Sequence, residues 1–161
     1  AAQGQTCTIA NDNCDGQIVI SGHKVAVLKA MDLAAKAGAK KSVLLPVSAP
    51  FHCPLMEPAA EVMREALDEI SIHAPLIPVL TNVSARPQCD PDVLKNHLVQ
   101  QVTGQVRWRE TISNLVPQDY SAIVEVGAGS VLTNLAKRIQ PDMKRINLQT
   151  PADIESFLST V

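Results

Sequence analysis

The chain has 161 residues, of which 46% are hydrophobic and 19% charged, and its formal net charge at pH 7 is −2. This length is enough to bury one core, and no apolar run reaches the roughly 18–20 residues that cross a bilayer. The small net charge and an aromatic content of 2% argue against nucleic acid as a partner. The four cysteines form no CxxC pair, so we expect reduced cytoplasmic thiols and neither a metal site nor a disulfide framework.

The first 48 residues predict two strands, a helix and a third strand. We expect strands over 6–10 and 17–21, joined by the turn-forming run NDNCDG. Apolar residues three and four apart predict a helix over 23–38, and the apolar run 41–48 predicts the next strand. A ferredoxin-like unit has the order βαββαβ, so this ββαβ order corresponds to such a unit without its opening β-α.

Helices alternate with short strands in the rest of the chain, which predicts a parallel α/β arrangement. The apolar run 122–126 is typical of a parallel strand that is buried on both faces. Asp90 is expected to cap a helix that Pro91 opens, because an Asp side chain accepts hydrogen bonds from the first free amides of a helix. The other expected helices cover 54–70, 107–116, 127–139 and 151–160, and the other expected strands cover 77–80 and 145–148.

His52 is the first candidate for chemistry. It lies in PVSAPFHCPLMEP, where Pro50 and Pro54 stiffen the backbone and lower the entropy lost when the ring is held in place. An imidazole titrates near neutral pH and can accept and return a proton in one cycle. A lone histidine is more often a structural residue, so both interpretations stay open on these residues alone.

Two further segments have a functional and a structural interpretation. In EVGAGS, Gly127 and Gly129 precede a predicted helix whose N-terminus could hold an anion or an oxyanion, but a plain strand-to-helix turn explains them as well. The run matches neither G-x-G-x-x-G nor G-x-S-x-G. Asn11 and Asn13 could bind a carbonyl or a carboxylate, and turn preference explains them equally. Glu125 at the end of the expected strand could be catalytic, but we expect it to pair with a Lys or an Arg.

Five sequence blocks follow one another along the whole chain: NDN…GQIVISGHKVAV, LPVSAPFHCPLMEPA, PVLTNVSARP, LVQQVTGQVRW and VEVGAGSVLTNLAKRI. Together they resemble the malonyl-CoA–acyl carrier protein transacylases of bacterial fatty-acid synthesis and the acyltransferase domains of polyketide and animal fatty-acid synthases. The resemblance implies a hydrolase-like parallel α/β core with an inserted ferredoxin-like subdomain. Residues 1–47 would be the C-terminal portion of the subdomain, and residues 48–161 the C-terminal portion of the core.

The resemblance also implies transfer of a malonyl group from coenzyme A to the phosphopantetheine thiol of acyl carrier protein, through a serine acyl-enzyme and without a bound cofactor. His52 matches the general base of the family, and the main-chain carbonyl of Gln101 matches the group that orients its ring. Phe directly before this His resembles the malonyl-selective synthase domains. Residues expected to line the substrate site are Asn11, Asn13, Phe51, Asn82, Gly127 and Gly129.

Three features of the family have no match in the chain. These are the GHSLG-type serine elbow, the N-terminal glutamine motif and the arginine that pairs with the malonyl carboxylate. The chain also begins without Met, so we expect it to be the C-terminal half of the enzyme and to be inactive without the other half. A piece of a polyketide synthase and a non-catalytic relative that binds carrier protein are the alternatives.

Overall fold

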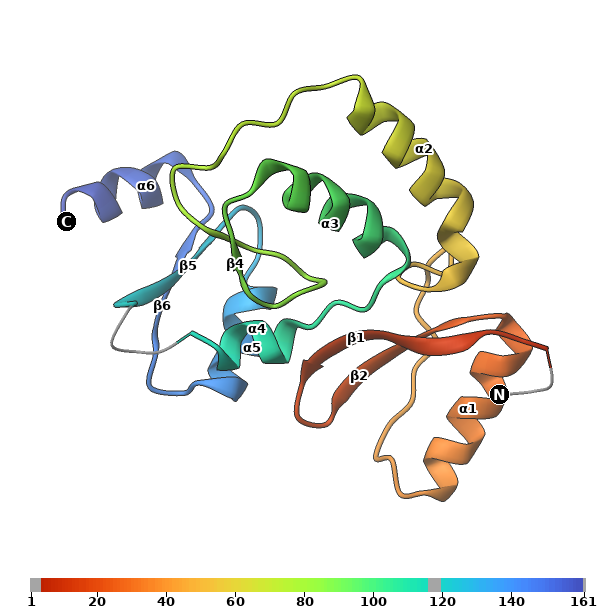
Figure 1. Cartoon of the computed structure of the whole chain (residues 1–161). Helices are drawn as coiled ribbons and strands as arrows, with labels where there is room; N and C mark the ends of the chain where they lie inside the picture. Colours follow the sequence, from red (N-terminus) through yellow and green to blue (C-terminus); the bar gives the residue numbers. More distant parts are fainter. Residues whose placement is uncertain (1–3, 116–119, 161) are drawn as a thin grey trace.

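The computed structural model describes residues 4–115 and 120–160 (Figure 1). Helices and strands alternate along the chain, which confirms the predicted α/β class. Val116, the last residue of the predicted helix 107–116, lies outside the described residues, as do residues 1–3 of the predicted first domain.

The elements are β1 (Cys7–Cys14), β2 (Gln17–Gly22), α1 (Lys24–Lys36), η1 (Pro54–Met56), α2 (Glu57–Asp68), β3 (Val79–Leu80), β4 (Pro87–Gln88), α3 (Pro91–Thr103), α4 (Trp108–Ser113), β5 (Ala122–Val126), α5 (Val131–Ile139), β6 (Lys144–Leu148) and α6 (Pro151–Leu158).

The β1–β2 hairpin is antiparallel and α1 packs beside it (Figure 1). Its turn is the pair Asp15–Gly16, and Gly16 has a φ of 74°, a conformation that glycine adopts without strain. The prediction that the whole NDNCDG run forms the turn is therefore wrong. Asn11 and Asn13 lie in strand β1 instead of a loop.

The strand predicted over 41–48 is absent from the structure. Residues 41–47 have no regular secondary structure and connect α1 to the segment before η1. Their large apolar side chains are about half exposed. A strand is defined by hydrogen bonds to a neighbouring strand, and no strand within 4–115 and 120–160 pairs with this segment. The described residues thus form ββα instead of the predicted ββαβ.

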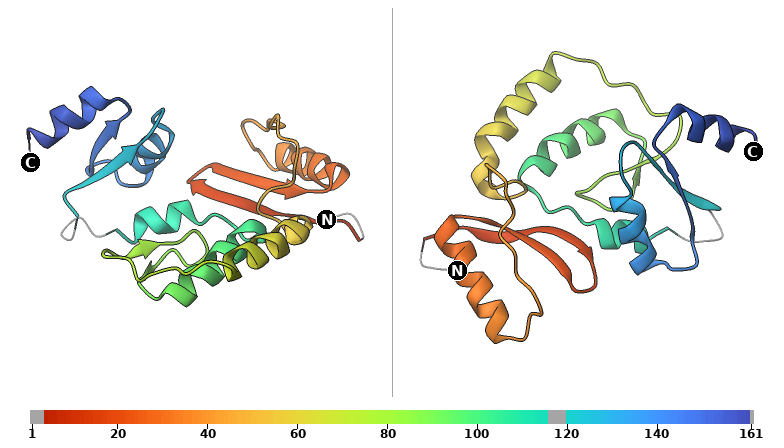
Figure 2. Two further views of the ribbon diagram at one scale, coloured as in Figure 1. Left: turned by 90° about the horizontal axis from the view of Figure 1, so that it is seen from above. Right: turned by 180° about the vertical axis from the view of Figure 1, so that it is seen from behind.

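Helices α2 and α3 lie side by side and share a hydrophobic cluster (Figure 2). Ala60 and Leu67 of α2 pack against Val99 of α3. The apolar spacing that predicts a helix over 54–70 also places Met63 and Ile70 on its buried side, and this is wrong, since they are 38% and 52% exposed. Asp90 caps α3 as predicted, with its Oδ1 accepting from the amides of Asp92 and Val93.

A short β3–β4 hairpin connects this helical pair, and the segment between its strands approaches the ends of α3 and α4. Ala85 in this segment is fully buried and has a φ of 52°. Its amide donates to the carbonyl of Thr81 at 2.9 Å, which closes the Thr81–Ala85 turn. The strand β4 was not predicted, because two residues that include a proline carry no strand pattern.

Strands β5 and β6 are parallel, as the sequence predicts, and α5 covers part of the sheet they form. Val126 at the end of β5 is nevertheless 72% exposed. Parallel sheets are normally covered on both faces, so this sheet offers an uncovered apolar surface. Helix α6 begins with a capping box between Thr150 and Asp153 and lies at the opposite end of the molecule from the β1–β2 hairpin (Figure 1). None of the helices in the described parts is long and apolar enough to traverse a bilayer.

Candidate active site

His52 occupies the tip of a tight turn between the exposed segment 41–48 and η1. Its φ is 58°, in the left-handed region that costs a residue with a side chain about 1 kcal/mol or more. The next residue, Cys53, is fully buried, and its thiol donates to the carbonyl of Pro50 at 3.1 Å. Met56 also donates its amide to the Cys53 carbonyl. The buried cysteine thus anchors a strained turn that presents the imidazole.

The imidazole contacts the C-terminal end of α3. Nδ1 of His52 lies 2.8 Å from the carbonyl oxygen of Gln101 and 3.2 Å from that of Gly104. These carbonyls are available because α3 ends at Thr103, and the last four carbonyls of a helix have no amide partner one turn further on. The Gly104 amide returns to Gln100, so the Gln101 carbonyl is left for the histidine.

These two contacts determine which ring nitrogen carries the proton. A carbonyl oxygen can only accept a hydrogen bond, so Nδ1 is the protonated nitrogen and donates to Gln101. In the neutral ring Nε2 then holds a free lone pair. Nε2 makes no hydrogen bond to any residue that the structure describes. An imidazole with one nitrogen held in this way and the other free can take up a proton, which is what a general base requires.

Asn82 joins this group from the Thr81–Ala85 turn. Its Nδ2 donates to the side-chain oxygen of Gln101 at 3.1 Å, while its carbonyl accepts from the Arg107 amide at 3.2 Å. Phe51 precedes His52 on the same turn and is 49% exposed. Four of the predicted site residues therefore lie in one neighbourhood: Phe51, His52, Asn82 and Gln101.

Strand β1 reaches this neighbourhood through Val106, which follows shortly after Gly104. Asp12 donates its amide to the Val106 carbonyl at 2.9 Å, and Val106 donates its amide to Ala10 at 2.8 Å. The Asp12 carboxylate also binds Arg109 of α4 in a two-pronged ion pair, which raises the pKa of the arginine. Asn11 and Asn13, half-buried on either side of Asp12, are thereby held near the end of α3.

Gly127 and Gly129 belong to a different neighbourhood. Gly127 donates its amide to the carbonyl of Leu148 at 2.9 Å, and Gly129 donates to the side-chain oxygen of Gln149 at 3.0 Å. Both glycines have positive φ values, 129° and 94°. In the described parts of the chain, the hydrogen bonds of the two glycines go to β6 and to Gln149 just after it, and not to the His52 group.

The N-terminus of α5, which follows the glycines, is occupied by the protein's own carboxylate. Glu125 accepts hydrogen bonds from the amides of Leu132 and Thr133, and also from the Thr133 hydroxyl and Asn147. Burial raises the pKa of Glu125, but these hydrogen bonds outweigh burial and leave the pKa below its ordinary value. The expected Lys or Arg partner of Glu125 is wrong, because these polar groups take its place.

Two cavities have linings that include none of the predicted site residues. One of about 130 Å³ is lined by Asp15, Arg109, Ser113, Arg138 and Ile139, and one of about 270 Å³ lies along β6 and α6. Neither is lined by His52 or Gln101. Among the described residues, no group of His, Cys, Asp and Glu could hold a metal ion.

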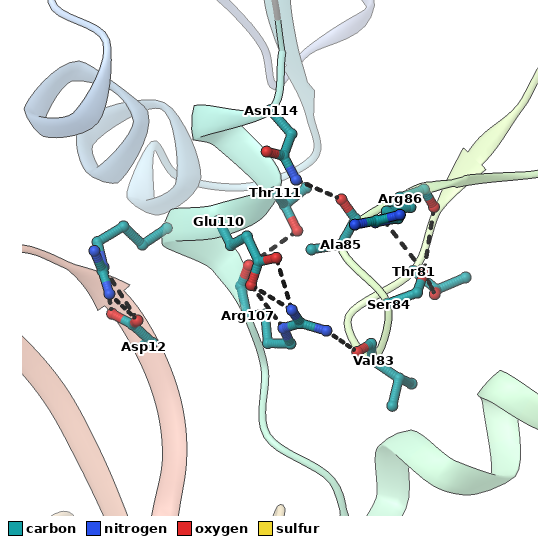
Figure 3. Close-up of polar contacts among 11 residues, drawn as sticks. Asp12, Thr81, Val83, Ser84, Ala85, Arg86, Arg107, Glu110, Thr111 and Asn114 are labelled. Carbon is teal, nitrogen blue, oxygen red and sulfur yellow. Dashed lines mark hydrogen bonds and ion pairs between the residues drawn. The ribbon is translucent and has the colours of Figure 1, made fainter.

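The sequence did not predict that Arg107 binds the Thr81–Ala85 turn, which carries Asn82. Its guanidinium donates to the carbonyl of Val83 and to both oxygens of Glu110 (Figure 3). The Arg–Glu spacing of three at a helix start was a usable signal for the ion pair. Nothing in the sequence pointed to Val83, because a backbone acceptor has no signature in the residue type.

The chain is similar to known proteins along almost its whole length. The model of the acyl transferase domain family matches residues 3–149. The chain belongs to this family. This acyl transferase domain is 39% identical to the malonyl CoA-acyl carrier protein transacylases of Bacillus subtilis and Escherichia coli, over 99% and 98% of its length. The resemblance inferred from the five sequence blocks is confirmed.

Solved structures agree with the sequence comparison. An acyl-carrier-protein-S-malonyltransferase from Bartonella henselae superposes with a TM-score of 0.93 at 49% identity, covering 99% of this chain and 51% of that one. A malonyl-transacylase in complex with a type II polyketide synthase acyl-carrier protein gives a TM-score of 0.93 at 37% identity, covering 99% of this chain and 52% of that one. The acyl transferase domain described here spans about half the length of the curated relatives it matches, 50% and 51% for the two named above.

Proposed function

We propose that this chain supplies the general-base half of a malonyl-CoA–acyl carrier protein transacylase of fatty-acid biosynthesis. The observation that carries the proposal is the hydrogen bond from His52 Nδ1 to the Gln101 carbonyl, which leaves Nε2 free to accept a proton. The relatives named above supply the substrate class, since their names specify malonyl-CoA and acyl carrier protein. We expect both to be substrates, with no bound cofactor and with the cytoplasm as the location.

The nucleophile comes from outside these residues, because the chain contains no G-x-S-x-G elbow. In the first step Nε2 of His52 takes the proton of that serine, and the serine oxygen attacks the malonyl thioester carbon. The carbon–sulfur bond breaks, and coenzyme A leaves as a thiol with the proton from the imidazolium. In the second step Nε2 takes the proton of the phosphopantetheine thiol, whose sulfur attacks the serine ester. The ester bond breaks and the serine recovers its proton.

The remaining half of the enzyme is the partner that we expect at the uncovered surfaces. Val126 of the parallel sheet and the apolar residues of segment 41–48 are exposed, and the relatives are about twice as long as this chain. Apolar surface of this kind is normally covered in a folded enzyme. We also propose a division at Val47, with residues 1–47 in the small subdomain and residues 48–161 in the core.

The proposed substrate-binding residues are assigned by their position close to His52 and Gln101. Asn82 contacts Gln101, Phe51 adjoins His52, and Asn11 and Asn13 lie on the strand that docks beside the end of α3. We propose that these side chains line the malonyl site. Gly127 and Gly129 are proposed to shape a more distant part of the pocket, and they do so as a rigid loop, since Glu125 already occupies the adjacent helix N-terminus.

The test uses the complete polypeptide that contains this sequence. Incubation with malonyl-CoA is expected to add one malonyl group to a serine, which intact-mass measurement detects. Addition of carrier protein in its phosphopantetheine form is expected to remove that group and to produce malonyl carrier protein. Absence of the adduct would overturn the acyl-enzyme, and carrier binding without transfer would favour a non-catalytic relative.

A further inference from the structure

Arg107 connects α4 to the Thr81–Ala85 turn through its side chain and its backbone. The guanidinium donates to the Val83 carbonyl at 2.8 Å and binds the Glu110 carboxylate through two nitrogens, at 2.7 and 2.6 Å (Figure 3). The Arg107 amide donates to the Asn82 carbonyl. A planar guanidinium has donors in a fixed fork, so pairing with Glu110 also sets the direction of the bond to Val83.

The turn that Arg107 grips has a strained conformation. Ala85 has a φ of 52° and is fully buried, and its carbonyl accepts from Asn114 of the segment after α4 at 3.0 Å. At the other end of the turn, the Thr81 hydroxyl lies 2.9 Å from Nδ1 of His97 on α3. A residue with a side chain stays in the left-handed region only where its surroundings hold it. Side chains from α3 and from α4 with its following residue provide that restraint.

The same turn contacts Gln101 and lies beside Gly104, the two residues whose carbonyls face His52. Asn82 binds the side chain of Gln101, and a methyl group of Val83 lies 3.6 Å from the position that a Cβ on Gly104 would take. These contacts are made at the end of α3, where intrahelical hydrogen bonds run out and the backbone is least restrained. The turn therefore supports the last residues of α3 from outside.

We propose that Arg107 is a positioning residue for His52. It holds the Thr81–Ala85 turn against the end of α3, the turn holds the carbonyls of Gln101 and Gly104, and these carbonyls keep the proton on Nδ1. The consequence for the reaction rests on the proposed role of His52 as a base, because a ring with its proton on Nε2 would have no lone pair facing the serine. The effect on the ring itself is independent of that role.

The test determines the His52 tautomer by nitrogen-15 NMR of the complete polypeptide that contains this sequence, at a pH where the ring is neutral. The chemical shifts of Nδ1 and Nε2 report which nitrogen is protonated. In the wild-type chain we expect the proton on Nδ1. In Arg107→Met we expect Nε2-protonated ring to become the major form, as it is for a free imidazole side chain in water. Arg107→Lys should fall between the two, because an ammonium cannot reproduce the fork.

Arg109→Met is the matched control. Arg109 lies two residues further along the chain and makes the same kind of two-pronged pair, but with Asp12 of β1 and not with the turn. This variant is expected to keep the proton on Nδ1. Circular dichroism establishes that each variant is folded, and if Arg107→Met is unfolded, Glu110→Gln replaces it with the same expected tautomer change.

An unchanged Nδ1-protonated ring in a folded Arg107 or Glu110 variant overturns the positioning role. An equal change in Arg109→Met also overturns it, because the effect would then belong to α4 as a whole. Neither result touches the proposed function, which fails instead if the complete enzyme with His52→Ala transfers malonyl at the wild-type rate. The two failures are thus separable, since the tautomer is measured without substrate.

Discussion

At the C-terminal end of α3 and at the N-terminal end of α5, the free backbone groups are bound by side chains of different kinds. Each helix end leaves backbone groups without partners, and in each case one titratable side chain from elsewhere in the chain binds them. At α3 the partner is His52, which uses one nitrogen and keeps the other free. At α5 the partner is Glu125, whose two oxygens both accept hydrogen bonds. A helix end thus points to chemistry only when its partner retains an unused reactive atom.

The largest effect is expected from His52→Ala in the complete enzyme. Removal of a general base typically lowers the rate by about 10²- to 10⁴-fold, so malonyl transfer should fall by that factor. The free energy of unfolding should change only slightly, because the ring is half-buried and its removal exposes little new apolar surface. Rates of malonyl transfer to carrier protein, measured alongside urea unfolding, check both parts. If His52→Ala kept the wild-type rate, His52 at the end of α3 would be as purely structural as Glu125 at the start of α5.

Leu67→Ala tests the packing that holds α3 in place. Leu67 is 8% exposed and belongs to the cluster that α2 and α3 share, so the variant should lose about 2–5 kcal/mol of unfolding free energy. Val62→Ala on the same helix is the control, since Val62 is 66% exposed and should change stability by less than about 0.5 kcal/mol. Urea unfolding measures both. Equal losses of unfolding free energy in the two variants would contradict the packing of α2 against α3 through the face that carries Leu67.

Glu125→Gln tests whether the carboxylate at α5 is structural. Because hydrogen bonds lower the pKa of this group in the folded protein, its charge stabilises the fold above the ordinary glutamate pKa of about 4.3. That contribution disappears as the pH falls through the folded value. The variant should therefore be less stable than wild type at pH 7, and the difference should shrink below about pH 4. A difference that stays constant from neutral to acidic pH would contradict the structural role of the charge.

The smallest effect is expected at the other end of α3. Asp90→Ala removes the side chain that accepts from the amides of Asp92 and Val93, which costs about 1 kcal/mol for a typical helix cap. Because the cap is far along the helix from Gln101, malonyl transfer by the complete enzyme should be unchanged. Thermal unfolding and the transfer rate check the two statements. A large loss of activity would mean that the whole helix, and not only its end, positions His52.

Local patterns accounted for most of the helices. Apolar spacing and the Asp90–Pro91 cap placed α3, and the helix after His52 was found where proline and apolar residues predicted it. The strand expected over 41–48 failed because a strand needs a hydrogen-bonding neighbour, and an apolar run does not specify one. Asn11 and Asn13 were predicted in a turn but lie in β1. The two residues Asp15 and Gly16 are sufficient for the hairpin turn, and the residues before them pair with β2.

The candidate site was predicted only in part. The proline-flanked sequence made His52 a candidate with a structural interpretation still open, and its proposed role, like that of Gln101, came from the family resemblance. The contact of Arg107 with the Thr81–Ala85 turn was not predicted. The tautomer of His52 was also beyond the sequence, because it depends on which acceptor faces which nitrogen. Glu125 was given the wrong partner, since the sequence could not show that the free amides of α5 lie at the end of its own strand.

By itself, the sequence determined the alternation of helices and strands, the cap of α3 and the presence of a titratable ring in a restrained loop. Those properties depend on residues that are close along the chain. Only the tertiary structure decided that the ring meets the carbonyls of Gln101 and Gly104, about fifty residues away, and that Arg107 grips the turn beside them. Backbone carbonyls are identical in every residue, so their use as partners follows from where a helix ends and what packs against that end.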